Sequence, residues 1–200
     1  MRHLLAGLVA GFLTALSPLL LGPAAADNPL ARLRGTVEAR TNDTLVLRPY
    51  TGGTVTTVLN PKTRIMIADR GNVRDIKPES YISVLSAPGD DADGVVIYSP
   101  SERGFEAGRQ PWDTKPGATL TAGWIIARDG RDPVRVRLGH AGGEAQFALP
   151  AATAATRIAP GEKALLVRGA HVVVFTRTDA SGVVNADTIV VGRQGVRPAL

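Results

Sequence analysis

The sequence predicts an all-β protein with two related small β units in tandem, joined by an irregular connector. Three observations support this prediction. Short runs rich in β-branched residues alternate apolar and polar positions, which is typical of half-buried strands, and turn sequences separate them. A stretch rich in proline and glycine, residues 99–118, interrupts this pattern near the middle of the chain. The runs on its two sides occur in the same order, which favours duplication of one unit.

The first 26 residues have the pattern of a secretory signal peptide. Arg2 gives a basic start, residues 4–21 an apolar segment, and Ala24 and Ala26 the small residues of an A-x-A cleavage site. We expect cleavage after Ala26 and a periplasmic or secreted, soluble mature chain that begins at Asp27. No later stretch reaches the roughly 18 consecutive apolar residues of a spanning helix, so we expect no transmembrane segment in the mature chain.

The first unit, residues 27–98, is expected to contain about six short strands. Turn chemistry separates them at Thr41-Asn42-Asp43, at residues 49–53 and at Asn60-Pro61. The expected strands are residues 33–39, 44–48, 54–59, 63–67, 81–85 and 95–98. Strands of this length with frequent turns predict a small barrel or sandwich.

The second unit, residues 119–192, follows the same plan, and a tail of residues 193–200 ends the chain. The corresponding segments are 170–174 with 80–84, 186–191 with 92–97, and 156–158 with 63–65. We therefore expect β-strands in both units and almost no helix.

Several motifs are more specific than this general pattern. The first unit contains Arg34-Gly35-Thr36-Val37 and Asp75-Ile76-Lys77-Pro78. The connector reads R-G-x-x-x-G-x-x-P-W-D-x-x-P-G-x-x-x-T, from Arg103 to Thr121. These motifs resemble those of a bacterial family of exported proteins of unknown function, built from small OB-like β-barrel repeats. The second unit departs from the pattern, since Leu166-Val167-Arg168-Gly169 stands where a D-L-K-P-G step is usual. The resemblance implies two tandem OB-like barrels and export, with no established activity.

Trp112 and Asp113 form the most specific candidate site in the connector. A tryptophan here either anchors a partner or a sugar ring, or plugs the seam between the two units while Asp113 caps the following turn. We favour the seam, because Pro111 and Pro116 restrict the backbone around the ring.

Arg135 and Arg137 share one face of an expected strand, with Arg128 and Arg131 close in sequence. Such a face suits an anionic polymer, as the faces of OB-like barrels often do. A solvated strand face is the alternative, and we favour it because few aromatic residues accompany the arginines.

Metal sites have little support in the sequence. Asp90, Asp91 and Asp93 precede Gly94 at a spacing that could offer oxygen ligands to Ca²⁺, but no glutamate follows at the twelfth position. A plain polar turn is therefore the favoured interpretation. After the signal peptide only His140 and His171 remain as histidines, and the chain has no cysteine. We expect no transition metal and no cofactor.

Composition and motifs narrow the function without identifying it. The net charge is +5, with basic residues dispersed among acidic ones, and the absence of cysteine excludes thiol catalysis. We expect a non-enzymatic binding or interaction module of the periplasm or envelope, with an envelope protein or an anionic polymer as its partner. Export argues against nucleic acid. A structural envelope assembly protein is the alternative. A hydrolase is more remote, because no G-x-S-x-G elbow occurs.

Overall fold

The computed structural model describes residues 31–88 and 92–200, so the expected signal peptide lies outside the described residues. The described residues form twelve strands in one hydrogen-bonded network and three single-turn 3₁₀ helices, which confirms the all-β class. The strands are β1 (Ala31–Arg40), β2 (Thr44–Pro49), β3 (Val55–Arg70), β4 (Tyr81–Ser86), β5 (Ala92–Tyr98), β6 (Gly108–Pro111), β7 (Thr119–Asp129), β8 (Val134–His140), β9 (Gly143–Leu149), β10 (Ala154–Pro160), β11 (His171–Thr178) and β12 (Val184–Gly192). The 3₁₀ helices are η1 (Val73–Asp75), η2 (Pro100–Glu102) and η3 (Lys163–Leu165). Within these described ranges, no helix combines the length and apolarity that crossing a bilayer requires.

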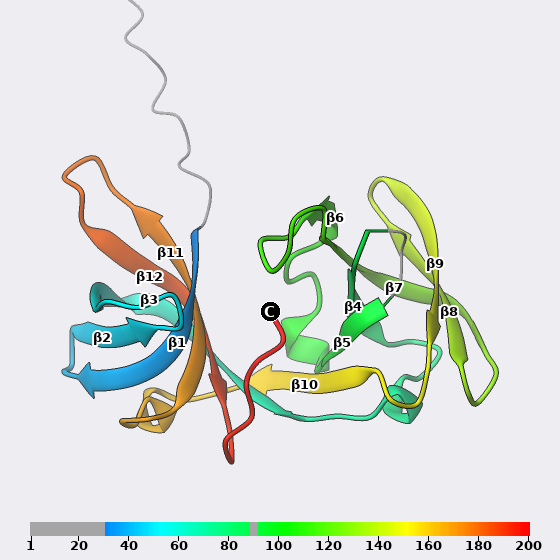
Figure 1. The fold of residues 1–200 in the computed structure, drawn as a ribbon, viewed down its shortest axis with the longest axis horizontal. Helices are drawn as coiled ribbons and strands as arrows, with labels where there is room; N and C mark the ends of the chain where they lie inside the picture. The colour runs from blue at the N-terminus through cyan, green and yellow to red at the C-terminus, as the bar shows by residue number, and fades with distance from the viewer. Residues whose placement is uncertain (1–30, 89–91) are drawn as a thin grey trace, which may run out of the picture.

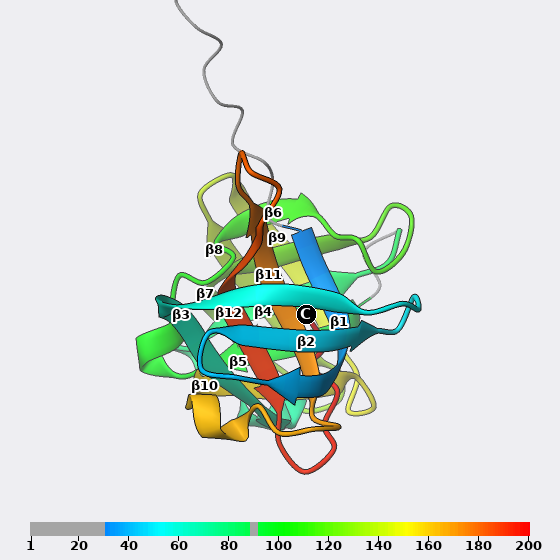
Figure 2. The ribbon, with the colours of Figure 1, turned by 90° about the vertical axis from the view of Figure 1, so that its left-hand side faces the viewer.

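Five strands close into a mixed β-barrel, seen at the left of Figure 1 and facing the viewer in Figure 2. β1 pairs antiparallel with β2 and β11, and β2 pairs antiparallel with β3. β12 pairs antiparallel with β11 and closes the barrel by pairing in parallel with β3. The order around the barrel is therefore β1-β2-β3-β12-β11. Its interior is filled by aliphatic side chains, among them Val37, Leu45, Leu47, Leu59, Ile65, Val172, Val174 and Ile189.

The long strand β3 corrects one expectation. Asn60-Pro61 was predicted to separate two strands, but residues 55–70 form a single strand. Side chains replace the missing ladder bonds at this point, because the Asn60 N–H donates to Thr63 Oγ1 (2.9 Å) and the Lys62 N–H donates to Asn60 Oδ1 (2.8 Å). Pro61 is exposed to solvent, so its lack of an N–H leaves no buried group without a partner.

The remaining principal strands form a second group, in the order β10-β5-β4-β7-β8-β9, with β6 paired to β7. β10 runs parallel to β5 and antiparallel to the end of β3, which joins the second group to the barrel. Its core contains Ile82, Val84, Val95, Ile97, Val134, Val136, Leu138, Phe147 and Leu149.

Two tandem barrels are not seen. A tandem arrangement needs β4 to pair with β1, whereas β4 pairs with β7, and β11 from the second half of the chain pairs with β1. The long β3 explains this exchange, because it has already carried the chain to the second group when β4 begins (Figure 1).

A third apolar cluster lies where the barrel meets the second group. It includes Tyr81, Tyr98, Trp112, Leu120, Ile158, Phe175, Val190 and Leu200. The connector contributes to it and is less irregular than expected, since it contains η2 and the short strand β6. The C-terminal tail also packs here: Arg193 N–H donates to Ala68 O (2.9 Å), and Leu200 is 1% exposed.

Candidate functional site

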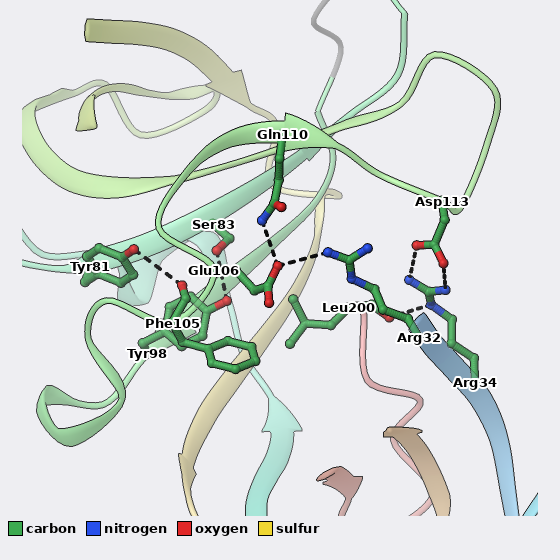
Figure 3. A network of polar contacts seen from close by, with 10 residues as sticks. All are labelled: Arg32, Arg34, Tyr81, Ser83, Tyr98, Phe105, Glu106, Gln110, Asp113 and Leu200. Atoms are coloured by element: carbon green, nitrogen blue, oxygen red, sulfur yellow. Dashed lines mark hydrogen bonds and ion pairs between the residues drawn. The ribbon is translucent and has the colours of Figure 1, made fainter. Parts of the chain in front are cut away.

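The predicted site residues fall in two separate places, and the first is the seam between the barrel and the second group. Trp112 is 3% exposed. The guanidinium carbon of Arg32 lies 3.8 Å from the ring centroid, so a strand of the barrel covers the ring. Arg32 is held there by Glu106 (3.0 Å), which also accepts a hydrogen bond from Gln110 Nε2 (2.7 Å; Figure 3). A ring buried in this way is not accessible to a sugar, and its position fits the seam interpretation.

Asp113 belongs to the same seam. Its two carboxylate oxygens accept hydrogen bonds from Arg34 at 2.9 and 2.7 Å, and Arg34 Nε donates to the main-chain oxygen of Leu200 at 2.7 Å (Figure 3). The Arg34 guanidinium lowers the pKa of Asp113 below its usual value through these hydrogen bonds. Asp113 thus joins the connector to β1 and, through Arg34, to the tail.

The other polar groups drawn in Figure 3 are also engaged within the seam. Tyr98 hydroxyl lies 2.9 Å from Ser83 Oγ, and the burial of the ring raises the pKa of Tyr98 far above its usual value. Tyr81 hydroxyl donates to the carbonyl of Phe105 at 3.4 Å. The contacts of Arg32 with Glu106 and of Arg34 with Asp113 join the barrel to the connector, so we assign these two pairs to holding the two groups of strands together. Arg32 Nε and Trp112 Nε1 are buried in the same seam without a hydrogen-bond partner.

The second place is the outer face of the sheet formed by β7, β8 and β9. Along β8, Val134, Val136 and Leu138 point into the core, while Arg135 and Arg137 alternate with them. A hollow of about 490 Å³ lies over this face. Its lining residues are Ala127, Arg128, Asp129, Arg135, Val136, Arg137, Gln146, Phe147 and Ala148.

Arg128 is turned toward the end of the sheet at the β7–β8 turn. Its Nε donates to Ile76 O (3.0 Å) and its Nη1 to Gly130 O (3.5 Å). An adjoining hollow of about 410 Å³ is lined by Arg74, Arg128 and Arg131. Arg135 reaches the same turn, since a Cβ atom at Gly130 would lie 3.7 Å from its Nη1.

We call Arg74, Arg128, Arg131, Arg135 and Arg137 the arginine surface. Four of these residues are the arginines that the sequence analysis named, and Arg74, which it did not name, comes from η1. Asn72 starts that helix with a reciprocal capping box, in which its side chain accepts from Arg74 N–H and Asp75 accepts from Asn72 N–H. The capping pattern predicts a turn at this point, but no local signal places the turn beside a strand more than fifty residues later.

The expected metal candidates do not form a site in the described part of the chain. Asp90 and Asp91 lie outside the described residues, and the Asp93 carboxylate contacts Lys115 Nζ at 2.7 Å. His140 is on β8 and His171 on β11, in different groups of strands. Residues 31–88 and 92–200 hold no cluster of three or more histidine or acidic side chains suited to a metal ion.

Comparison with known proteins yields no significant match to a protein-family model, a curated protein or a solved structure. The resemblance carried by the connector motif therefore stays a prediction. The arginine surface is interpreted from its own geometry and charge.

Proposed function

We propose that this chain is an exported, non-enzymatic module that binds an anionic polymer of the cell envelope through the arginine surface. The observation that carries the proposal is the hollow lined by three arginines from separate elements, Arg74 on η1, Arg128 near the end of β7 and Arg131 in the β7–β8 turn. A guanidinium group offers a planar fork of donors to carboxylate, phosphate or sulfate, and it stays charged at any physiological pH.

The geometry favours an extended ligand over a small ion. Arg135 and Arg137 are two residues apart on one strand face, so their Cα atoms are separated by about 7 Å. Arg74, Arg128 and Arg131 extend the positive charge around the end of the same sheet. Arg128 is already oriented by two main-chain oxygens, which lowers the entropy cost of using it in binding. Open hollows in a row suit a chain with repeated charges.

We also propose that both groups of strands are OB-like units that have exchanged their last two strands. The barrel order β1-β2-β3-β12-β11, with one parallel closure, supports this proposal. In the second group β7, β8 and β9 take the positions of β1, β2 and β3. OB-folds bind ligands over their second and third strands and the loop before them. Within the arginine surface, Arg135 and Arg137 lie on the corresponding second strand, β8, and Arg131 lies in the β7–β8 turn before it.

Export is part of the proposal and rests on residues 1–26. Replacing Ala24 and Ala26 with large residues should leave uncleaved precursor at the membrane, because the peptidase requires small side chains at these positions. Amino-terminal sequencing of the wild-type protein should give Asp27. Recovery of wild-type protein with residues 1–26 intact would contradict the export proposal.

The binding proposal is tested with residues 27–200 and long-chain polyphosphate, by calorimetry at two salt concentrations. We expect affinity to fall with salt and to fall by about tenfold or more in the variant Arg74→Gln/Arg131→Gln/Arg135→Gln, because charge-assisted contacts are lost. The control Arg40→Gln/Arg48→Gln/Arg168→Gln removes the same charge from exposed positions outside the arginine surface. Equal losses in both variants, or no binding by wild-type protein, would contradict the proposal.

A further inference from the structure

The two tryptophans of the chain have opposite environments. Trp112 is 3% exposed, whereas Trp124 on β7 is 46% exposed. The Trp124 ring is nevertheless held in place. The Tyr81 ring meets it edge-on at 5.5 Å with an interplanar angle of 76°, and the Arg103 guanidinium carbon lies 4.9 Å from its centroid. An aromatic ring that is both positioned and exposed is suited to stacking on a ligand.

A hollow of about 660 Å³ lies beside Trp124. Gly139 is the direct cross-strand neighbour of both Trp124 and Glu144, so the row across the three strands reads aromatic ring, bare backbone, carboxylate. A Cβ atom at Gly139 would lie 2.7 Å from Ile126 Cδ1, which shows that Ile126 lies over this position. Ile126 is 46% exposed and adds an apolar surface beside the ring.

The polar groups of this hollow suit hydroxyl groups. Glu144 supplies a carboxylate acceptor whose side chain is 54% exposed. His140 Nδ1 accepts a hydrogen bond from Gly142 N–H at 3.1 Å, so a neutral His140 carries its proton on Nε2 and can donate it. A sugar ring has an apolar face for Trp124 and hydroxyls that both donate and accept.

The hollow and part of the arginine surface lie on the same strand, β8. Arg137 follows on the same face of β8, two residues from Gly139, and its Nε lies 3.5 Å from Glu144 Oε2. Arg135 is two residues further along. Along β8, the Cα atom of Arg137 is therefore about 7 Å from that of Gly139, the neighbour of Trp124, and the Cα atom of Arg135 is about 13 Å from it.

We propose that this face binds an acidic polysaccharide, with one sugar ring stacked on Trp124 and the carboxylates of the glycan on Arg137 and Arg135. The inference rests on the proposed function, because it identifies the class of the anionic polymer. Trp124 positions one sugar ring of the polysaccharide, and Arg135 and Arg137 bind its carboxylate groups.

The test compares two probes on residues 27–200: a galacturonate hexamer, which is an acidic glycan, and a polyphosphate of similar charge. Calorimetry gives both dissociation constants, and tryptophan fluorescence reports on the exposed Trp124. We expect Trp124→Ala to weaken hexamer binding at least tenfold and to leave polyphosphate binding within twofold. The control Tyr50→Ala removes a 50% exposed aromatic ring from the barrel side and should change neither constant.

A second variant should change the affinities for the two probes in opposite directions. Glu144→Ala should weaken the hexamer, because a hydroxyl acceptor is lost, and should strengthen polyphosphate, because a negative charge beside Arg137 is removed. This variant also decides the matter if Trp124→Ala does not fold.

The outcomes separate the two proposals. If neither probe binds, or if the triple arginine variant binds both as wild type does, the proposed function itself is wrong. If polyphosphate binds through the arginines while Trp124→Ala and Glu144→Ala leave hexamer binding unchanged, only the glycan inference is overturned. Tighter, Trp124-dependent binding of a thymidine oligonucleotide would overturn it in favour of a single-stranded nucleic acid.

Discussion

The barrel and the second group have one local backbone feature in common. The β1–β2 pairing shifts register between Val37 and Ala39, and the β7–β8 pairing shifts in the same way between Ile125 and Ala127. Two residues before each shift, a glycine crosses the neighbouring strand so closely that a Cβ atom would lie 2.2 Å from a carbonyl oxygen. In both regions, therefore, a glycine allows two strands to cross closely, and a register shift follows two residues later.

Their outer faces are different. Where the barrel places Thr36 opposite Arg48, the second group places Trp124 opposite Gly139. Where the barrel has Val46 opposite Ala39, the second group has Arg137 opposite Ala127. The same backbone feature therefore carries different side chains at its outward positions in the two regions, and under the proposed function these side chains would decide which region binds a ligand.

Closure is the second difference. In the barrel, one strand of 16 residues, β3, pairs with β2 and then with β12. In the second group the corresponding stretch is broken into β9 and β10, with a turn at residues 150–153 between them. Within the described residues, β9 has a ladder only with β8.

The largest expected effect comes from separating the two sequence halves. Residues 27–98 alone lack β11 and β12, so the barrel cannot close, and we expect this fragment to be unfolded. Mixing it with residues 99–200 should restore the fold, as judged by the dispersion of amide signals in NMR spectra. A well-dispersed spectrum from residues 27–98 alone would show that the exchange of strands is not required.

Burial of the two tryptophans predicts a large difference in stability. Trp112→Ala should lower the free energy of unfolding by about 3–5 kcal/mol, because a buried ring is removed from the seam. Trp124→Ala should cost about 1 kcal/mol or less, since the ring is half exposed. Chemical denaturation and acrylamide quenching of the remaining tryptophan measure both effects. Similar costs for the two variants would contradict the assigned environments.

Equivalent glycines should respond alike. We expect Gly35→Val and Gly123→Val each to lower the free energy of unfolding by about 2 kcal/mol or more, because either side chain must displace main-chain atoms. Gly94→Ala is the control, since its Cβ atom would meet its nearest neighbour at an ordinary 3.5 Å. Urea unfolding measures the series. Tolerance of one substitution and not the other would break the equivalence of the two regions.

The smallest effect concerns the ion pair of the seam. Because Arg34 lowers the pKa of folded Asp113 below its ordinary value of 3.8, the pair stabilises the protein above that pH and is lost as pH falls through the lowered pKa. We expect Asp113→Asn to cost less than about 1 kcal/mol at pH 7, because solvent screens the partly exposed pair. The cost should shrink toward pH 2 in thermal unfolding. A cost that is independent of pH would show that Asp113 does not act through its charge.

Local patterns predicted the strands well because alternation is a local property. Arg135 and Arg137 were placed on one face for this reason, and the turn at Thr41–Asp43 follows from residue chemistry. Asn60-Pro61 misled the prediction because side-chain hydrogen bonds let a strand continue through it.

Non-local features could not be predicted in this way. Trp124, Ile125 and Ile126 form an apolar run, and such a run does not show which of its members face the core and which face solvent. Arg74 reaches the arginine surface through tertiary packing. The exchange of β4–β5 with β11–β12 depends on which edges are free after β3 crosses the molecule, and alternation says nothing about partners.

The closure of the barrel has a consequence for the time at which this protein folds. β1 begins at Ala31, and its partner across the β11 ladder is Thr176. The barrel cannot form until almost the whole chain has been synthesised. The two strands must then pair although Ala31 and Thr176 are 145 residues apart in the sequence. Native contacts of such long range slow folding and leave sheet edges open in the meantime. We expect this chain to fold slowly and only after its synthesis is complete, in an interval when open strand edges invite aggregation.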